Sequence, residues 1–149
     1  MRRLAVTVLA FEGYDVSAAQ NAESARQEMA RRLPDIVLMD RDLAGVNGLD
    51  LTRQIKADPR NREIAVLAFT ASDSREDDAQ AIAAGTDGFV SKPIDTPVLL
   101  RTIAWHAAAR ELRLGVRRTT PVRRDTGGFE RPLGAATRSP SAPVRLTDR

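Results

Sequence analysis

The sequence contains no cysteine, which excludes thiol nucleophiles, cysteine metal ligands and disulfide bonds. Aromatic residues make up only 4% of its 149 residues, so a hydrophobic core must consist mainly of Leu, Ile, Val and Ala. Long hydrophobic runs are also missing, and none approaches the roughly 18 apolar residues that a membrane-spanning helix needs. The length is sufficient for one domain with an additional tail.

Neither sign of charge dominates the whole chain, which has a net charge of +3 and a pI of about 10.1. The two ends differ, because residues 1–109 are mildly acidic and residues 110–149 are basic. The high pI therefore describes the tail and does not indicate that the body binds nucleic acid. The pairs Arg117-Arg118 and Arg123-Arg124 leave two interpretations: contact with nucleic acid or an acidic partner, or a solvated tail.

The most informative stretch is the apolar run Ile36–Met39, which ends at Asp40. A short run without alternation, bounded by Pro34 and Gly45, is typical of a strand buried in a parallel sheet. Ligands of open α/β sheets bind beyond the carboxyl ends of the strands. Asp40 is therefore a candidate functional residue, although an Asp that only begins a turn is the alternative.

The rest of the chain alternates between predicted strands and helices. Strand patterns cover residues 14–18, 36–39, 64–69 and 88–91. Helical spacing, caps and breakers predict five helices. Two of them cover residues 2–12 and 49–56. The other three begin at a cap: one runs from Asn21 to residue 32, one from within residues 72–74 to residue 84, and one from residue 95 or 96 to residue 112. This alternation predicts repeated βαβ units, with a parallel sheet and helices on both faces. Residues 1–112 form this domain, and residues 113–149 are expected to be a disordered basic tail.

Polar residues follow three of these strands: Asp40, Thr70 and Lys92. A carboxylate, a hydroxyl and an ammonium at strand ends, with Lys92 followed by Pro93, resemble the receiver domain of bacterial response regulators. The matching stretches are residues 35–48, 64–71 and 83–93. The resemblance covers residues 1–112 and implies a flavodoxin-like, doubly wound sheet with the strand order 2-1-3-4-5.

The resemblance also implies a role for each of these side chains. Asp40 would accept the phosphoryl group, and Lys92 would pair with the phosphoryl oxygens. Thr70 would donate its hydroxyl to the phosphoryl group, and Phe89 would change its rotamer with the state of the switch. The Lys92-Pro93 peptide bond would be cis.

The chain departs from the family pattern at its beginning, where the usual first strand and its two acidic residues are missing. In the family these acids hold Mg²⁺ together with the acceptor, here Asp40, and a backbone carbonyl, here that of Asp42. We therefore expect at most a weak Mg²⁺ site. Either the strands at 14–18 and 36–39 pair directly, or this half of the domain is loose. A truncated fragment, a mis-assigned start and a degenerate domain are all compatible with the sequence.

Three functions remain open. The first is phosphorelay signalling by a stand-alone receiver-like domain of a two-component system, with a histidine kinase or phosphotransfer protein as phosphodonor and a downstream protein bound by the last two helices and the last strand. The second is a degenerate receiver that binds proteins without phosphorylation. The third is a small phosphatase with Asp40 as its nucleophile, although no general acid is evident.

We expect a cytoplasmic protein that is not an enzyme. The alternative for its location is secretion, with residues 1–18 as a signal peptide. His106 receives no role, and the acidic residues 76–78 are interpreted as a solvated helix start.

Overall fold

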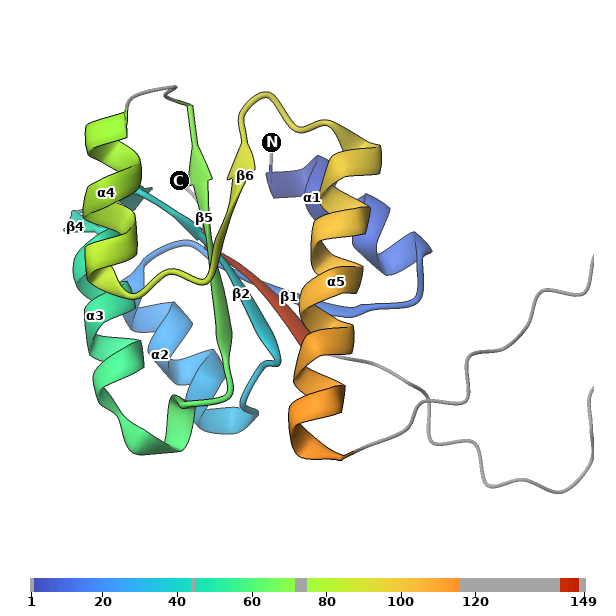
Figure 1. Ribbon diagram of the computed structural model, residues 1–149, viewed down its shortest axis with the longest axis horizontal. Helices are drawn as coiled ribbons and strands as arrows, with labels where there is room; N and C mark the ends of the chain where they lie inside the picture. Colours follow the sequence, from blue (N-terminus) through green and yellow to red (C-terminus); the bar gives the residue numbers. More distant parts are fainter. Residues whose placement is uncertain (1, 44, 72–74, 116–142, 148–149) are drawn as a thin grey trace, which may run out of the picture.

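The computed structural model describes residues 2–43, 45–71, 75–115 and 143–147. A five-stranded parallel sheet in the order β1-β7-β2-β5-β6 forms the centre of the fold. Helices α1 and α5 lie on one side of the sheet, and α2, α3 and α4 lie on the other (Figure 1). The predicted doubly wound α/β class is confirmed.

The helices are α1 (Arg2–Phe11), α2 (Ala22–Arg31), α3 (Gly48–Ala57), α4 (Arg75–Ala84) and α5 (Thr96–Leu114), with a 3₁₀ turn η1 (Pro59–Asn61). The sheet consists of β1 (Asp15–Ala19), β2 (Ile36–Asp40), β5 (Ala65–Thr70), β6 (Gly88–Ser91) and β7 (Pro143–Thr147). The short strands β3 (Asp42–Leu43) and β4 (Val46–Asn47) form an antiparallel pair after β2. Every predicted helix and strand is present with shifts of one or two residues, whereas the cap predicted within residues 72–74 lies outside the described residues.

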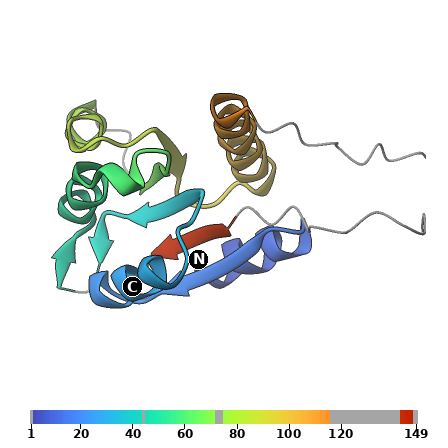
Figure 2. The same ribbon diagram turned by 90° about the horizontal axis from the view of Figure 1, so that it is seen from below.

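Strand β7 corrects the prediction that all of residues 113–149 are disordered. It lies between β1 and β2 (Figure 2) and pairs in parallel with both, with Val144 opposite Val16 on one side and Ile36 on the other. The expectation that β1 and β2 pair directly, or leave this half loose, is therefore wrong. The sheet position that the sequence analysis regarded as vacant is occupied by a strand that follows α5 in the chain.

Both faces of β2 are buried, which explains its unbroken apolar run. Ile36 and Leu38 pack in the cluster beneath α1 and α5, and Val37 and Met39 pack in the cluster beneath α2 and α3. All four side chains are at most 1% exposed. Fully burying such a side chain stabilises the folded state by about 1.5–3 kcal/mol, so β2 fixes the two layers against each other.

Capping residues fix the helix ends that the sequence predicted. The Asn21 side chain accepts a hydrogen bond from the backbone N–H of Ser24 at 2.8 Å, and the backbone N–H of Asn21 donates to the Ser24 hydroxyl at 3.2 Å. Asp95 caps α5 by accepting from the N–H of Val98 at 2.9 Å. Each arrangement satisfies an N–H group that a helix start leaves without an intrahelical partner.

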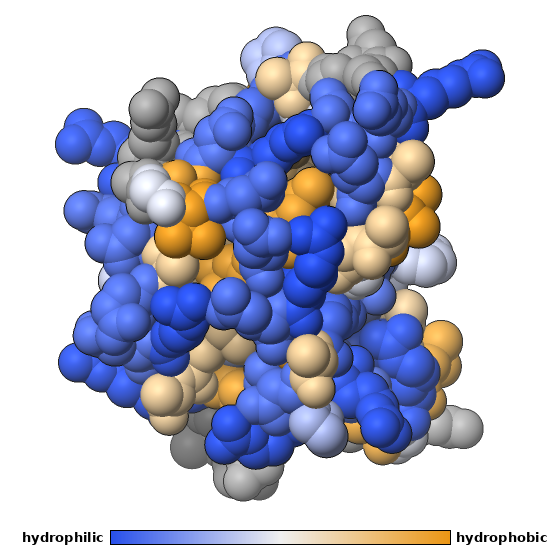
Figure 3. Space-filling view, turned by 90° about the vertical axis from the view of Figure 1, so that its left-hand side faces the viewer, coloured by the Kyte–Doolittle hydropathy of each residue, from blue (hydrophilic) through white to orange (hydrophobic). Residues whose placement is uncertain are grey.

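The face of the molecule that carries α3 and α4 is largely polar (Figure 3). On the side that carries α3 and α4, apolar areas are small and separated by hydrophilic side chains (Figure 3). Within the described ranges, no helix combines the length and the apolar character needed to cross a membrane.

Candidate functional site

Asp40 and Lys92 meet at the carboxyl end of the sheet. Asp40 is the last residue of β2 and is only 3% exposed, and Lys92 directly follows β6. The Lys92 ammonium donates to Asp40 Oδ2 at 2.6 Å, and Asp40 Oδ1 accepts from the backbone N–H of Asp42 at 3.1 Å. Because parallel strands end at the same edge, two residues that are 52 positions apart form an ion pair.

Thr70 lies on the strand between these two residues. Strand β5 pairs with β2, with Phe69 opposite Asp40, and Thr70 is the next residue. Its carbonyl accepts from the backbone N–H of Lys92 at 2.7 Å, which extends the β5–β6 ladder by one bond. The Lys92-Pro93 peptide bond is cis, as the resemblance implied. The sheet thus brings the three predicted strand-end residues to one place.

Phe89 and Thr70 line one small cavity. Phe89, on β6, is half-buried and packs against a cluster that includes Leu49, Ala68 and Ala81. The cavity beside it has a volume of about 20 Å³, and Thr70 forms another part of its wall. This volume holds one water molecule. Thr70 and Phe89, both of which the resemblance connects with the phosphorylated state, therefore border the same free space, which the small side chains of Ala68 and Ala81 also line.

Arg41 is a site residue that the sequence analysis missed. It follows Asp40 and forms an ion pair with Asp77 and a hydrogen bond of 3.1 Å with Gln80, both on α4. The acidic first turn of α4 was predicted to be solvated, and for Asp77 this is wrong. The spacing of Asp77 and Gln80 was the available signal, because residues three apart lie on one helix face and can bind the same guanidinium.

Gly48 allows the chain to pass very close to the end of β2. Its backbone N–H donates to the carbonyl of Arg41 at 2.7 Å. A Cβ atom at this position would lie 1.9 Å from the backbone oxygen of Asp40. Gly45 adopts a φ of 80°, which L side chains rarely adopt. The β3–β4 turn thus brings the start of α3 against the end of β2.

The resemblance to receiver domains implies a Mg²⁺ ion, which the described residues do not provide for. Among them, no group of three or more His, Asp or Glu side chains is placed to hold a metal. Asp40 already accepts from Lys92 and from the N–H of Asp42, whereas Mg²⁺ needs about six oxygen ligands in octahedral geometry. The described residues alone therefore do not fit Mg²⁺.

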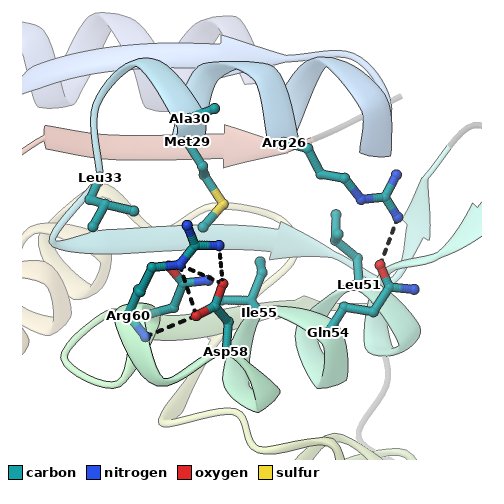
Figure 4. A pocket seen from close by; sticks show the side chains of 10 residues that line it. Arg26, Met29, Ala30, Leu33, Leu51, Gln54, Ile55, Asp58 and Arg60 are labelled. Atoms are coloured by element: carbon teal, nitrogen blue, oxygen red, sulfur yellow. Dashed lines mark hydrogen bonds and ion pairs between the residues drawn. The ribbon is translucent and has the colours of Figure 1, made fainter.

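A separate pocket of about 510 Å³ lies between α2 and α3 (Figure 4). Met29, Leu51 and Ile55 form its apolar part, while the charged groups at its rim are bound to one another. Arg60 pairs with Asp58 at 2.6 Å, and Arg26 donates to Gln54. None of the predicted site residues lines this pocket, so we place the candidate site at Asp40 despite the larger volume here.

Comparison with known proteins identifies the family to which this architecture corresponds. Residues 1–104 match the family model described as the response regulator receiver domain. The chain is 39% identical over 101 residues to response regulator PleD of Caulobacter vibrioides, which is 68% of this chain and 22% of PleD. It is 34% identical over 91 residues to the polar-differentiation response regulator DivK of Brucella anthropi, which is 61% of this chain and 74% of DivK.

A solved structure shows the same likeness. The crystal structure of a putative response regulator from Chloroflexus aurantiacus aligns with a TM-score of 0.69 and 25% identity, over 72% of this chain and 88% of that chain. The chain thus spans most of this solved structure but less than a quarter of PleD.

Proposed function

We propose that Asp40 is the phosphoryl acceptor of this chain, which belongs to the family of response regulator receiver domains. Receiver domains of this family act in phosphorelay signalling and interact with histidine kinases and downstream effectors. The observation that carries the proposal is the buried Asp40 carboxylate, which is held at the end of β2 with the Lys92 ammonium at 2.6 Å.

The proposed transfer uses groups that are already in place. An Asp40 oxygen attacks the phosphorus of a phosphohistidine on a histidine kinase or phosphotransfer protein. A P–O bond forms while the P–N bond breaks, and the imidazole leaves with the bonding electron pair. Lys92 now pairs with Asp40, and after transfer it would pair with a phosphoryl oxygen instead, which offsets part of the added charge of about −1.5 to −2.

The proposed response to this charge involves Thr70 and Phe89. The Thr70 hydroxyl donates to the phosphoryl group, and Phe89 moves toward the cavity that both residues line. The face formed by α4, β6 and α5 then repacks and changes its affinity for a downstream protein. Such a switch needs a coupling free energy of only about 1–3 kcal/mol. The chain acts in this way in the cytoplasm as a switch and turns over no substrate of its own.

The test is chemical labelling of the full chain with acetyl phosphate, with and without Mg²⁺, followed by intact-mass and peptide mass spectrometry. We expect one phosphoryl group, on Asp40, and no labelling of an Asp40→Asn variant. Asp50→Asn is the matched control, because Asp50 is an exposed residue of α3 that pairs with Arg53. Labelling that survives Asp40→Asn, or that is lost in the control, would contradict the assignment.

A second candidate, a receiver that binds partners without phosphorylation, is favoured by the absence of a metal-binding acidic group in the described ranges. A circular-dichroism melt with Mg²⁺ and beryllium fluoride, which mimics the aspartyl phosphate, separates the two functions. A rise in Tm supports the acceptor function. An unchanged cooperative melt, together with no acetyl phosphate labelling, supports the binding module. Steady turnover of a phosphate ester would instead indicate an enzyme.

A further inference from the structure

The sheet position between β1 and β2 is filled by a strand that is distant in sequence from both of its neighbours. β7 is bonded to β1 over residues 143–147 and to β2 over residues 144–147. β1 lies at the edge of the sheet, with β7 as its neighbouring strand. The sheet hydrogen bonds that join β1 to the rest of the fold are therefore all made by the five residues of β7.

The connection between α5 and β7 is long enough to leave β7 independent of the body. Residues 116–142 separate the two elements, and their composition is rich in Arg, Thr, Pro and Gly. A chain of this length can extend over about 3.3–3.6 Å per residue, so it does not by itself fix where β7 lies. The position of β7 is instead fixed by its two ladders of parallel pairing.

We propose that the space between β1 and β2 is a binding site for one extended peptide strand, and that Pro143–Thr147 is its tethered ligand. Recognition is by strand addition on both sides, in which backbone hydrogen bonds provide the affinity and the parallel register provides the specificity. The tether supplies the strand at an effective concentration on the order of millimolar. The strand is therefore a separable part of the fold, which can leave and return.

Strand docking also controls the acceptor site, and this step rests on the proposed function. Thr147 pairs with Met39, the residue before Asp40, so β7 ends beside the acceptor. When β7 leaves, β2 loses one of its two neighbouring strands, and the end of β2 is no longer held from both sides. We therefore expect Asp40 to accept a phosphoryl group only while β7 is docked.

The experiment uses the full chain with a protease site inserted between Gly127 and Gly128. The folded protein is cut, and the two fragments are analysed by native mass spectrometry and by thermal melting at several concentrations. We expect the fragments to stay associated and Tm to rise with concentration, because docking is now bimolecular. A fluorescent peptide of residues 139–149 should replace the cut fragment. The control peptide carries Val144→Pro and Leu146→Pro, which remove two backbone N–H donors, and should fail to bind.

Acetyl phosphate labelling of the cut protein, before and after the fragment is removed, distinguishes the two proposals. Labelling that is lost on removal and restored by the peptide supports both. Labelling that persists without the strand overturns the control of Asp40 but leaves the acceptor function. Strand-dependent melting without any labelling overturns the acceptor function but leaves the strand site. A body that melts at the same temperature without the fragment overturns the strand site itself.

Discussion

Gly48→Ala is the sharpest test of how α3 is placed against the end of β2. Helix propensity alone predicts that alanine in this helix is favoured over glycine by roughly 0.5–1 kcal/mol. The structure predicts the opposite sign. The added Cβ would lie 1.9 Å from the Asp40 oxygen, 2.9 Å from the Asp40 carbonyl carbon and 3.2 Å from the Arg41 Cα. All three atoms belong to the backbone, so no flexible side chain can turn away.

Relief of this overlap requires α3 or the end of β2 to move by about 1 Å or more, and inserting atoms into a packed site typically costs about 1–3 kcal/mol. We expect a net loss of about 2 kcal/mol in the free energy of unfolding, measured by urea titration with circular-dichroism detection. At roughly 4 °C per kcal/mol, Tm should fall by about 8 °C. Labelling of Asp40 should also slow, because the displaced backbone carries the acceptor.

The matched control is Gly115→Ala, at the end of α5. Gly115 has a φ of 67° and nothing within 4 Å of an added Cβ. The loss of stability in Gly115→Ala therefore comes only from the left-handed backbone conformation that alanine must adopt. This cost is about 1–2 kcal/mol, and labelling should not change. A Gly48→Ala protein as stable as the parent, or more stable, would refute the close approach of α3 to Asp40.

Three further predictions concern single side chains. Burial lowers the pKa of His106, so at mildly acidic pH the unfolded chain binds a proton that the folded chain does not. The free energy of unfolding should therefore fall as the pH drops below about 6.5, and it should fall less steeply in His106→Leu. Urea titrations at several pH values measure both slopes. Lys92→Ala removes the charged hydrogen bond to Asp40 and should lower the unfolding free energy by about 2 kcal/mol. Asp95→Ala removes the cap of α5 and should cost about 1 kcal/mol in the same assay.

The sequence was sufficient to predict the elements whose signals are local. Ile36–Met39 is apolar throughout because β2 is buried on both faces, and Asn21 and Asp95 cap their helices through contacts within three residues. The strand-end residues Asp40 and Lys92 could be placed together because parallel strands share an edge. For β2 and the two caps, a short stretch of sequence contains the whole physical cause.

The failures involve contacts between distant residues. Pro143–Thr147 has only two large apolar residues within a basic segment, and its strand conformation depends on pairing with β1 and β2. In α1, Leu4, Val8 and Phe11 share one apolar helix face, which the spacing alone would place against the core. The helix buries Ala5 and Leu9 instead and leaves Phe11 88% exposed. Both faces have helical spacing, and only the space beneath the helix selects between them.

The position of β7 between β1 and β2 has a consequence for the order in which the protein is made. Ribosomal synthesis proceeds from the N-terminus, so α1 to α5 emerge before the strand that separates β1 from β2. Until residues 143–147 are translated, the edges of β1 and β2 that β7 later joins have backbone groups that are not paired with a neighbouring strand. Unpaired edges of this kind promote aggregation. The last pairing step also closes some of the longest loops in the fold, which places this receiver domain among topologies that fold slowly.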